Sequence, residues 1–192
     1  MRVRVVALAL ALVGAGCGVR DRAATAADAP PRFGFGRPAT PAEVSAWDID
    51  VMPDGTGLPP GSGIASQGAA LFQLRCAVCH GRTGTEGPAG PLVGREPRQG
   101  FPFGRNPRLV STIGNYWPYA TTLYDYINRA MPLNAPGSLT PDEVYGLVAF
   151  LLWRNEIIAD TAVMNARTLP RVVMPARDRF VRDNRRGGRT IR

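Results

Sequence analysis

The sequence predicts an all-α domain built from three main helices. Apolar residues recur at helical spacing in three segments, near 64–76, 121–130 and 141–155. Stretches rich in Gly and Pro precede the first segment and separate it from the second. With 192 residues, the chain has room for one ordinary domain with extensions and not for two full domains.

The first helix is expected from Ile64 to Cys76, where the small and apolar residues share one helical face. The segment from Gly81 to Gly114 is rich in Gly, Pro and Arg and is expected to be a long loop with a function of its own. The second helix is expected from Thr121 to Ala130, and Pro132 would end it.

The third helix carries the clearest local signals. Thr140 suits the N-cap, Pro141 suits the first helical position, and Glu143 completes a capping box. Apolar residues then repeat at helical spacing up to Trp153, so the helix is expected to end near Asn155.

A short motif, Cys76-Ala77-Val78-Cys79-His80, lies at the end of the first predicted helix. Two thiols at this spacing can each add to a haem vinyl group, and the adjacent imidazole can bind the iron as proximal ligand. The motif therefore predicts one covalently attached haem c, with the three helices packed around it.

Two other kinds of site share the C-x-x-C spacing. A thioredoxin-like redox site would follow a strand in a βαβ unit, and a zinc site would need two further Cys or His ligands. His80 is the only histidine and Cys17 the only other cysteine, so a zinc site would have to recruit carboxylates. The haem interpretation is favoured over both.

The second axial ligand of the iron is sought among the methionines, because the chain has no second histidine and no lysine. Met131 is favoured over Met52, Met164 and Met174, since it lies beside Pro132 between two predicted helices. It could equally fill core space, and water, an open position or a weaker donor remain possible. Thioether ligation would favour electron transfer, whereas an open iron would favour a gas sensor or a peroxidase.

Further cofactor contacts are expected from the long loop. A backbone carbonyl near Pro91 could accept the imidazole N–H of His80, although this stretch could simply form a turn. Tyr116 and Trp117, with Tyr119 and Arg105, could contact the haem propionates, or the aromatic residues could be plain core.

The N-terminus predicts export. Two arginines precede an apolar run from Val5 to Val13 and small residues before Cys17, which is the order of a secretory signal covering residues 1–17. Cys17 could be the acylated cysteine of a lipoprotein, tethering the chain to a membrane; the alternative is cleavage near Ala24, leaving a soluble exported protein. A periplasmic or otherwise exported location is expected either way.

The expected organisation is a signal (1–17), an extended arm ordered only where Trp47 can pack (18–63), a haem domain (64–160) and a basic C-terminal tail (161–192).

All 23 basic residues are Arg, and the formal net charge is +8. Residues 177–192 hold seven Arg against Asp178 and Asp183. An acidic partner surface, anionic lipid headgroups or plain solubility could explain the tail, and export argues against nucleic acid.

Over residues 61–160 the chain resembles the class I cytochromes c, through Gly68, Phe72, the haem motif, the Gly-Pro-Leu loop at 90–92 and Met131. It more specifically resembles the cytochrome subunit of Sox-type sulfur dehydrogenases and of related sulfite dehydrogenases. The segments that carry this resemblance are 36–40, 47–50, 54–55, 58–63, 116–127 and 129–132.

This resemblance implies a partner subunit with a molybdenum cofactor that oxidises sulfite or protein-bound sulfane sulfur and passes single electrons to the haem. The arm and the tail would then bind that partner. Some relatives carry two haems, whereas this chain has one attachment motif. We therefore expect a non-catalytic electron-transfer subunit that also serves a downstream acceptor. The alternatives are a free-standing exported cytochrome serving an oxidase or reductase, and a haem sensor or peroxidase.

Overall fold

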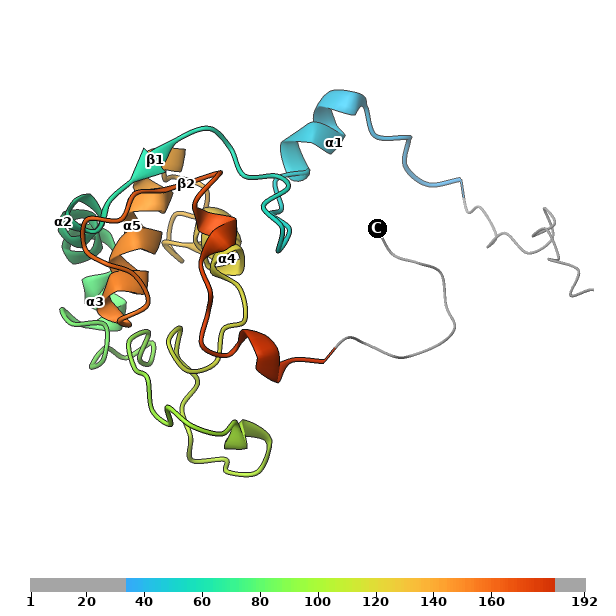
Figure 1. The fold of residues 1–192 in the computed structure, drawn as a ribbon. Coiled ribbons are helices and arrows are strands. Elements are labelled where there is room, and N and C mark those ends of the chain that lie inside the picture. Colours follow the sequence, from blue (N-terminus) through green and yellow to red (C-terminus); the bar gives the residue numbers. More distant parts are fainter. Residues whose placement is uncertain (1–33, 182–192) are drawn as a thin grey trace, which may run out of the picture. The chain divides into compact units, whose positions relative to one another are not determined.

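A computed structural model describes residues 34–181 of the chain (Figure 1). The predicted signal peptide with Cys17 and the end of the predicted tail lie outside the described residues. The elements in chain order are α1 (Pro41–Trp47), β1 (Ser62–Gly63), α2 (Ala65–Arg75), α3 (Ala77–His80), η2 (Pro102–Gly104), α4 (Ala120–Ala130), α5 (Pro141–Arg154), β2 (Met164–Asn165), η3 (Leu169–Arg171) and η4 (Arg177–Arg179), where η denotes a 3-10 helix.

The three predicted helices are present as α2, α4 and α5, and the all-α fold class is confirmed. The N-terminus of α5 has the predicted capping box: Thr140 Oγ1 accepts from the Glu143 N–H at 3.4 Å, and the Glu143 carboxylate accepts from the Thr140 N–H at 2.7 Å. These bonds satisfy backbone donors that the first helical turn cannot pair internally.

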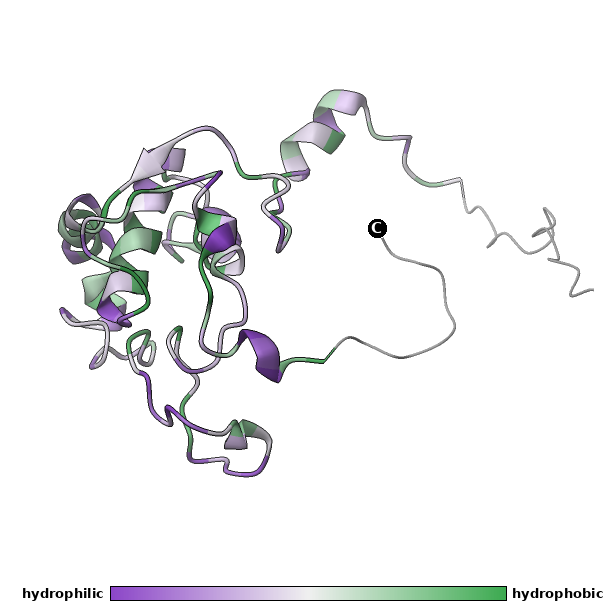
Figure 2. Cartoon of the chain, viewed as in Figure 1, coloured by the Kyte–Doolittle hydropathy of each residue, from purple (hydrophilic) through white to green (hydrophobic). Residues whose placement is uncertain are grey.

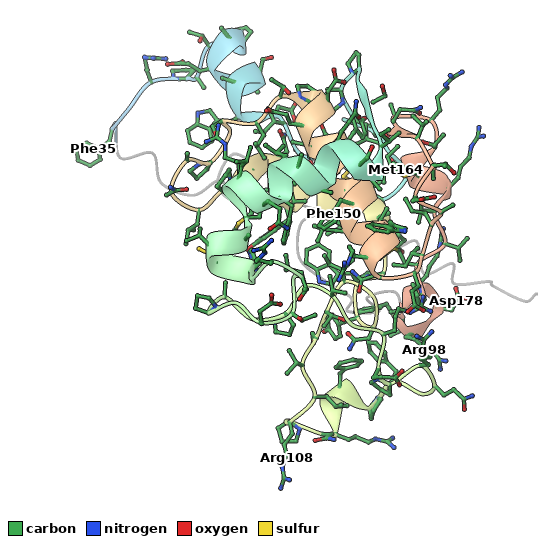
Figure 3. The ribbon with its side chains drawn as sticks, turned by 90° about the vertical axis from the view of Figure 1, so that its left-hand side faces the viewer. Phe35, Arg98, Arg108, Phe150, Met164 and Asp178 are labelled. Carbon is green, nitrogen blue, oxygen red and sulfur yellow. The ribbon has the colours of Figure 1, made fainter. Side chains whose placement is uncertain are left out.

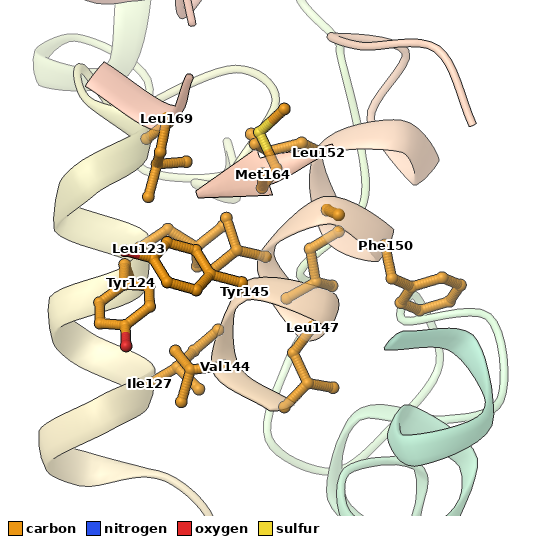
Figure 4. Packing of buried hydrophobic residues seen from close by; sticks show 14 of the residues in the cluster. Leu123, Tyr124, Ile127, Val144, Tyr145, Leu147, Phe150, Leu152, Met164 and Leu169 are labelled. Atoms are coloured by element: carbon orange, nitrogen blue, oxygen red, sulfur yellow. The ribbon is translucent and has the colours of Figure 1, made fainter. Parts of the chain in front are cut away.

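Helix α5 forms the centre of the core. Every residue from Tyr145 to Leu152 is buried, as is Val144. One side of α5 packs against Leu123, Tyr124 and Ile127 of α4 (Figure 4). On another side it crosses α2, where Gly68 and Gly146 let the two backbones approach closely (Figure 1).

Residues on both sides of the predicted boundaries at 63/64 and 160/161 share this core. Before the first boundary, the Val51 N–H donates to Asp125 Oδ1 at 2.9 Å, and Tyr145 Oη donates to the Pro59 carbonyl at 2.9 Å. After the second boundary, β2 pairs antiparallel with β1. Between residues 161 and 181, the buried side chains are Met164, Leu169, Met174 and Ala176.

Helix α1 was not predicted, and the expectation that Trp47 orders the arm by packing is wrong. Trp47 is 86% exposed, and no residue of α1 is buried. A second capping box, formed by Thr40 and Glu43, stabilises this helix from its N-terminus. Local hydrogen bonding therefore defines α1, without burial of a side chain.

The chain divides into two compact units, residues 1–39 and 40–192. The first is described only over residues 34–39, which are exposed and contain neither helix nor strand. Within residues 34–181, no helix is long and apolar enough to span a bilayer.

Candidate functional site

A largely apolar cavity of about 610 Å³ opens beside α3, within the usual size range of small-molecule sites. It brings together two parts of the chain that are far apart in sequence: the motif residues Cys76, Cys79 and His80, and Met131. The remaining lining is supplied mainly by α2, α4, α5 and the loops that connect them. These residues are Phe72, Leu74, Arg75, Val78, Ala89, Leu92, Tyr126, Ile127, Pro132, Leu133, Asn134, Leu139, Leu147 and Leu151.

The Cys-x-x-Cys-His motif forms a single helical turn. Cys76 ends α2 and begins α3, and its carbonyl accepts from the His80 N–H at 2.9 Å. Residues three and four apart on a helix share a face, so both thiols and the imidazole lie on the same side of this turn. Burial raises the pKa of the Cys76 thiol to about 11, with a further contribution from Cys79.

His80 contacts the loop that follows the motif. Its Nδ1 lies 3.5 Å from the carbonyl oxygen of Gly90, so Gly90 rather than the predicted Pro91 presents the acceptor. Gly90 has φ +82°, a left-handed conformation that favours glycine and turns the chain back toward the motif. Such a bond fixes the orientation of a ligating imidazole.

The turn just after the motif is held by Glu86. Its carboxylate accepts hydrogen bonds from the hydroxyls of Thr83 and Thr85, and these bonds lower the pKa of Glu86 to about 2. The carboxylate is therefore ionised at neutral pH and keeps the turn closed. This turn brings Ala89 back so that its N–H donates to the Cys79 carbonyl at 2.9 Å.

Asn155, at the C-terminal end of α5, anchors the next part of the loop and is fully buried. Its Oδ1 accepts from the Gly94 N–H at 2.9 Å, and its Nδ2 donates to the carbonyls of Leu92 and Leu151 at 3.3 and 2.8 Å. Leu92 lines the cavity and Asn155 does not, so Asn155 positions a residue of the cavity wall through its backbone. Sequence reasoning identified Asn155 only as the end of a helix.

We predict that Asn155→Leu lowers the free energy of unfolding by about 1–3 kcal/mol, because it leaves the half-buried N–H of Gly94 without its partner. The Leu92 carbonyl also loses the Asn155 donor but keeps its hydrogen bond from the Ile113 N–H. Urea denaturation of the haem-loaded protein measures this change. Glu156→Gln is the control, since its ion pair with Arg98 is exposed and should be worth less than about 0.5 kcal/mol. Equal effects of the two substitutions would contradict the role given to Asn155.

Met131 lies directly after α4, where its N–H donates to the Ile127 carbonyl at 3.1 Å. It is half-buried and lines the cavity. The other candidate methionines do not line it: Met164 and Met174 are buried in the core, and Met52 is 51% exposed. Of the candidates, only Met131 shares a cavity with His80.

The structure does not bring Pro91, Tyr116 or Trp117 to the cavity. Tyr116 packs instead against Phe101, with ring centroids 5.5 Å apart. Trp117 meets the cavity residue Tyr126 edge-on, with ring centroids 5.9 Å apart. Arg105 is exposed, and Tyr119 lies beneath the guanidinium of Arg177. The apolar residues that line the cavity could not be predicted from the sequence. Helical periodicity identifies the buried face of a helix, but it does not distinguish residues that pack in the core from residues that line a cavity.

The donor set fits the predicted cofactor. Cys76 and Cys79 could form two thioethers, His80 and Met131 could supply axial ligands, and the apolar lining could exclude water from the ring. No cluster of three or more His, Cys, Asp or Glu suited to a metal ion occurs among the described residues.

Comparisons with known proteins agree with this geometry. Residues 63–151 match the family described as cytochrome C oxidase, cbb3-type, subunit III. A chain in the crystal structure of the sulfane dehydrogenase SoxCD from Paracoccus pantotrophus is 41% identical, with a TM-score of 0.67. The similarity covers 80% of this chain and 73% of that one. No curated protein sequence matches.

Fold and comparisons together define a class I cytochrome c, which carries covalently bound haem c and acts in electron transfer. Within this class, the chain belongs to the SoxD-like cytochromes, the family related to the SoxCD sulfane dehydrogenase.

Proposed function

We propose that this cytochrome is the electron-transfer subunit of a complex with a molybdenum-containing sulfite or sulfur dehydrogenase. The observation that carries the proposal is the 41% identity to a chain of SoxCD over 80% of the present chain. This similarity extends well beyond residues 63–151, which are the part common to cytochrome domains.

The extent of the similarity supports a shared complex and not merely a shared haem fold. Four fifths of the chain is about 154 residues, whereas residues 63–192 number only 130. At least about 24 matched residues must therefore lie before residue 63, in the arm. The arm from Val51 to Gly63 contacts the core, whereas helix α1 buries no side chain. An exposed segment of this kind is expected to contact another subunit.

In this proposal, haem held at the cavity supplies a one-electron Fe(III)/Fe(II) couple. Cys76 and Cys79 hold the ring, His80 and Met131 are the axial ligands, and the Gly90 carbonyl orients the imidazole. Phe72, Leu147 and Leu151 exclude water from the buried side of the cavity. No side chain of this chain performs acid–base chemistry. The haem-binding fold extends beyond residues 64–160, because Val51 and Met164 belong to its core. The protein is exported by the signal at residues 1–17, with Cys17 as a candidate lipid anchor.

The test is purification of the tagged haem-loaded chain from its native host. We expect molybdenum to co-purify in proportion to haem, and sulfite or thiosulfate to reduce the haem rapidly without an added dehydrogenase. A Cys76→Ser, Cys79→Ser double variant is the matched control: it should lack covalent haem and show no reduced spectrum. A monomeric cytochrome, free of molybdenum and unresponsive to both sulfur compounds, would instead favour a free-standing electron carrier.

A further inference from the structure

Asp125 is a buried carboxylate on α4, six residues before Met131, and it does not line the cavity. The residue is 8% exposed, so its side chain is largely removed from water. A buried carboxylate is costly unless it is paired and hydrogen-bonded. Its partners come from two directions, the last turn of its own helix and the arm that precedes β1. Asp125 therefore joins two parts of the chain.

The partner in the last turn of α4 is Arg129. Its Nε donates to Asp125 Oδ1 at 2.9 Å, and its Nη2 donates to the other carboxylate oxygen, Oδ2. Two parallel bonds between a guanidinium and a carboxylate fix the relative orientation of both groups. The same turn ends at Met131, whose N–H donates to the Ile127 carbonyl at 3.1 Å. The ion pair thus stabilises the turn that presents Met131 to the cavity.

The partner in the arm is the backbone of Val51, whose N–H donates to the same Oδ1 of Asp125 at 2.9 Å. Of residues 34–60, only Val51 is buried. Helix α1 ends four residues earlier at Trp47; it mixes hydrophilic and hydrophobic residues (Figure 2) and buries none of them. One carboxylate oxygen therefore accepts a hydrogen bond both from the arm and from the last turn of α4.

A second hydrogen bond ties the arm to the opposite end of α4. Thr121 Oγ1 donates to the Pro53 carbonyl at 3.3 Å. Thr121 is also buried, and it lies ten residues before Met131, or about 15 Å away along a helix axis. It contacts the same part of the arm without contacting the turn that carries Met131. Thr121 therefore provides a comparison for Asp125 within the same helix.

We propose that Asp125 is a positioning residue for the sixth ligand of the haem iron: it holds the last turn of α4 and thereby keeps the sulfur of Met131 on the iron. Helix ends open locally because their terminal groups lack intrahelical partners. Met131 follows Ala130, the last residue of α4, so its position depends on how firmly this turn is held. This inference rests on axial ligation by Met131, as in the proposed function.

The experiment measures how often Met131 leaves the iron. Excess cyanide added to the ferric, haem-loaded chain binds only after the methionine has left, so the limiting rate of cyanide binding equals the rate of methionine release. Asp125→Asn should raise this rate about tenfold, because a neutral amide replaces the charge-assisted acceptor of Arg129. Arg129→Gln should raise it in the same direction. Arg129 is exposed, so this variant tests the proposal even if Asp125→Asn does not fold.

Two variants are matched controls. Thr121→Val removes the contact between the arm and the far end of α4, and it should leave the limiting rate within about twofold. Arg108→Gln removes one positive charge, as Arg129→Gln does. Arg108 is exposed at the far end of the loop at residues 95–110, which projects away from the helices (Figure 3), so its loss should also leave the rate within about twofold.

The outcomes separate the positioning role from the alternatives. The unmodified rate in both Asp125→Asn and Arg129→Gln would overturn the proposal. An equal rise in Thr121→Val would also overturn it, because any loosening of the arm would then suffice. An equal rise in Arg108→Gln would overturn it in favour of net charge.

Met131→Ala distinguishes failure of this inference from failure of the ligand assignment. If the far-red thioether band of the ferric protein survives in Met131→Ala, Met131 is not the ligand and both proposals fail. If the band is lost in Met131→Ala while the Asp125 and Arg129 variants release methionine at the unmodified rate, only the positioning role fails.

Discussion

Replacing Met131 by alanine is expected to lower the reduction potential of the haem by about 0.1 V or more and to open the iron to external ligands. Thioether sulfur favours the ferrous state, so its loss removes the stabilisation of Fe(II). Met131 is the one candidate methionine that lines the cavity with His80. Alanine at this position cannot reach the iron, and the cavity would admit water or carbon monoxide in its place.

Three measurements check this expectation. Potentiometric titration gives the reduction potential, the ferric spectrum gives the far-red thioether band, and carbon monoxide binding to the reduced protein reports an open site. Met52→Ala, Met164→Leu and Met174→Leu are the controls; leucine is used at the two buried positions to keep their packing. If the thioether band survives in Met131→Ala, the ligand assignment is wrong. Rapid carbon monoxide binding by the unmodified protein would favour a sensor or peroxidase.

The helices and the haem motif were predictable because their signals are local. The capping box at Thr140 and the apolar repeat that follows it define α5 within a few residues. The same capping signal occurs at Thr40-Pro41-Ala42-Glu43, where α1 begins. No long apolar repeat follows it, so helical periodicity does not predict this helix.

The rest of the site depends on contacts that sequence spacing does not specify. The acceptor for His80 is the Gly90 carbonyl because the chain reverses at Gly90, one residue before the position that was predicted. Tyr116 was expected near the haem but packs against Phe101 and, across 64 residues of sequence, against Phe180. Such long-range pairings follow from the tertiary fold, and single-sequence periodicity does not contain them.

The crossing of α2 and α5 gives the largest expected effect on stability. Gly68→Ala would place a methyl group in steric overlap with the backbone carbonyl of Gly146, and 2.8 Å from the Cβ of Phe150. A backbone carbonyl cannot rotate aside as a flexible side chain can, so the two helices would have to separate. We expect the free energy of unfolding to fall by about 3 kcal/mol or more, and the yield of haem-loaded protein to fall with it.

The partner glycine at the same crossing should respond differently. A methyl group at Gly146 would lie 3.2 Å from the Gly68 nitrogen and 3.5 Å from its Cα, which a small shift can relieve. Alanine also gains about 0.5–1 kcal/mol over glycine within a helix. The two terms roughly cancel, so Gly146→Ala should change the unfolding free energy by less than about 1 kcal/mol.

Gly104→Ala, whose methyl group meets nothing within 4 Å, is the neutral control. Urea denaturation of the three variants measures the asymmetry; equal losses for Gly68→Ala and Gly146→Ala would show that the helices cross in another register.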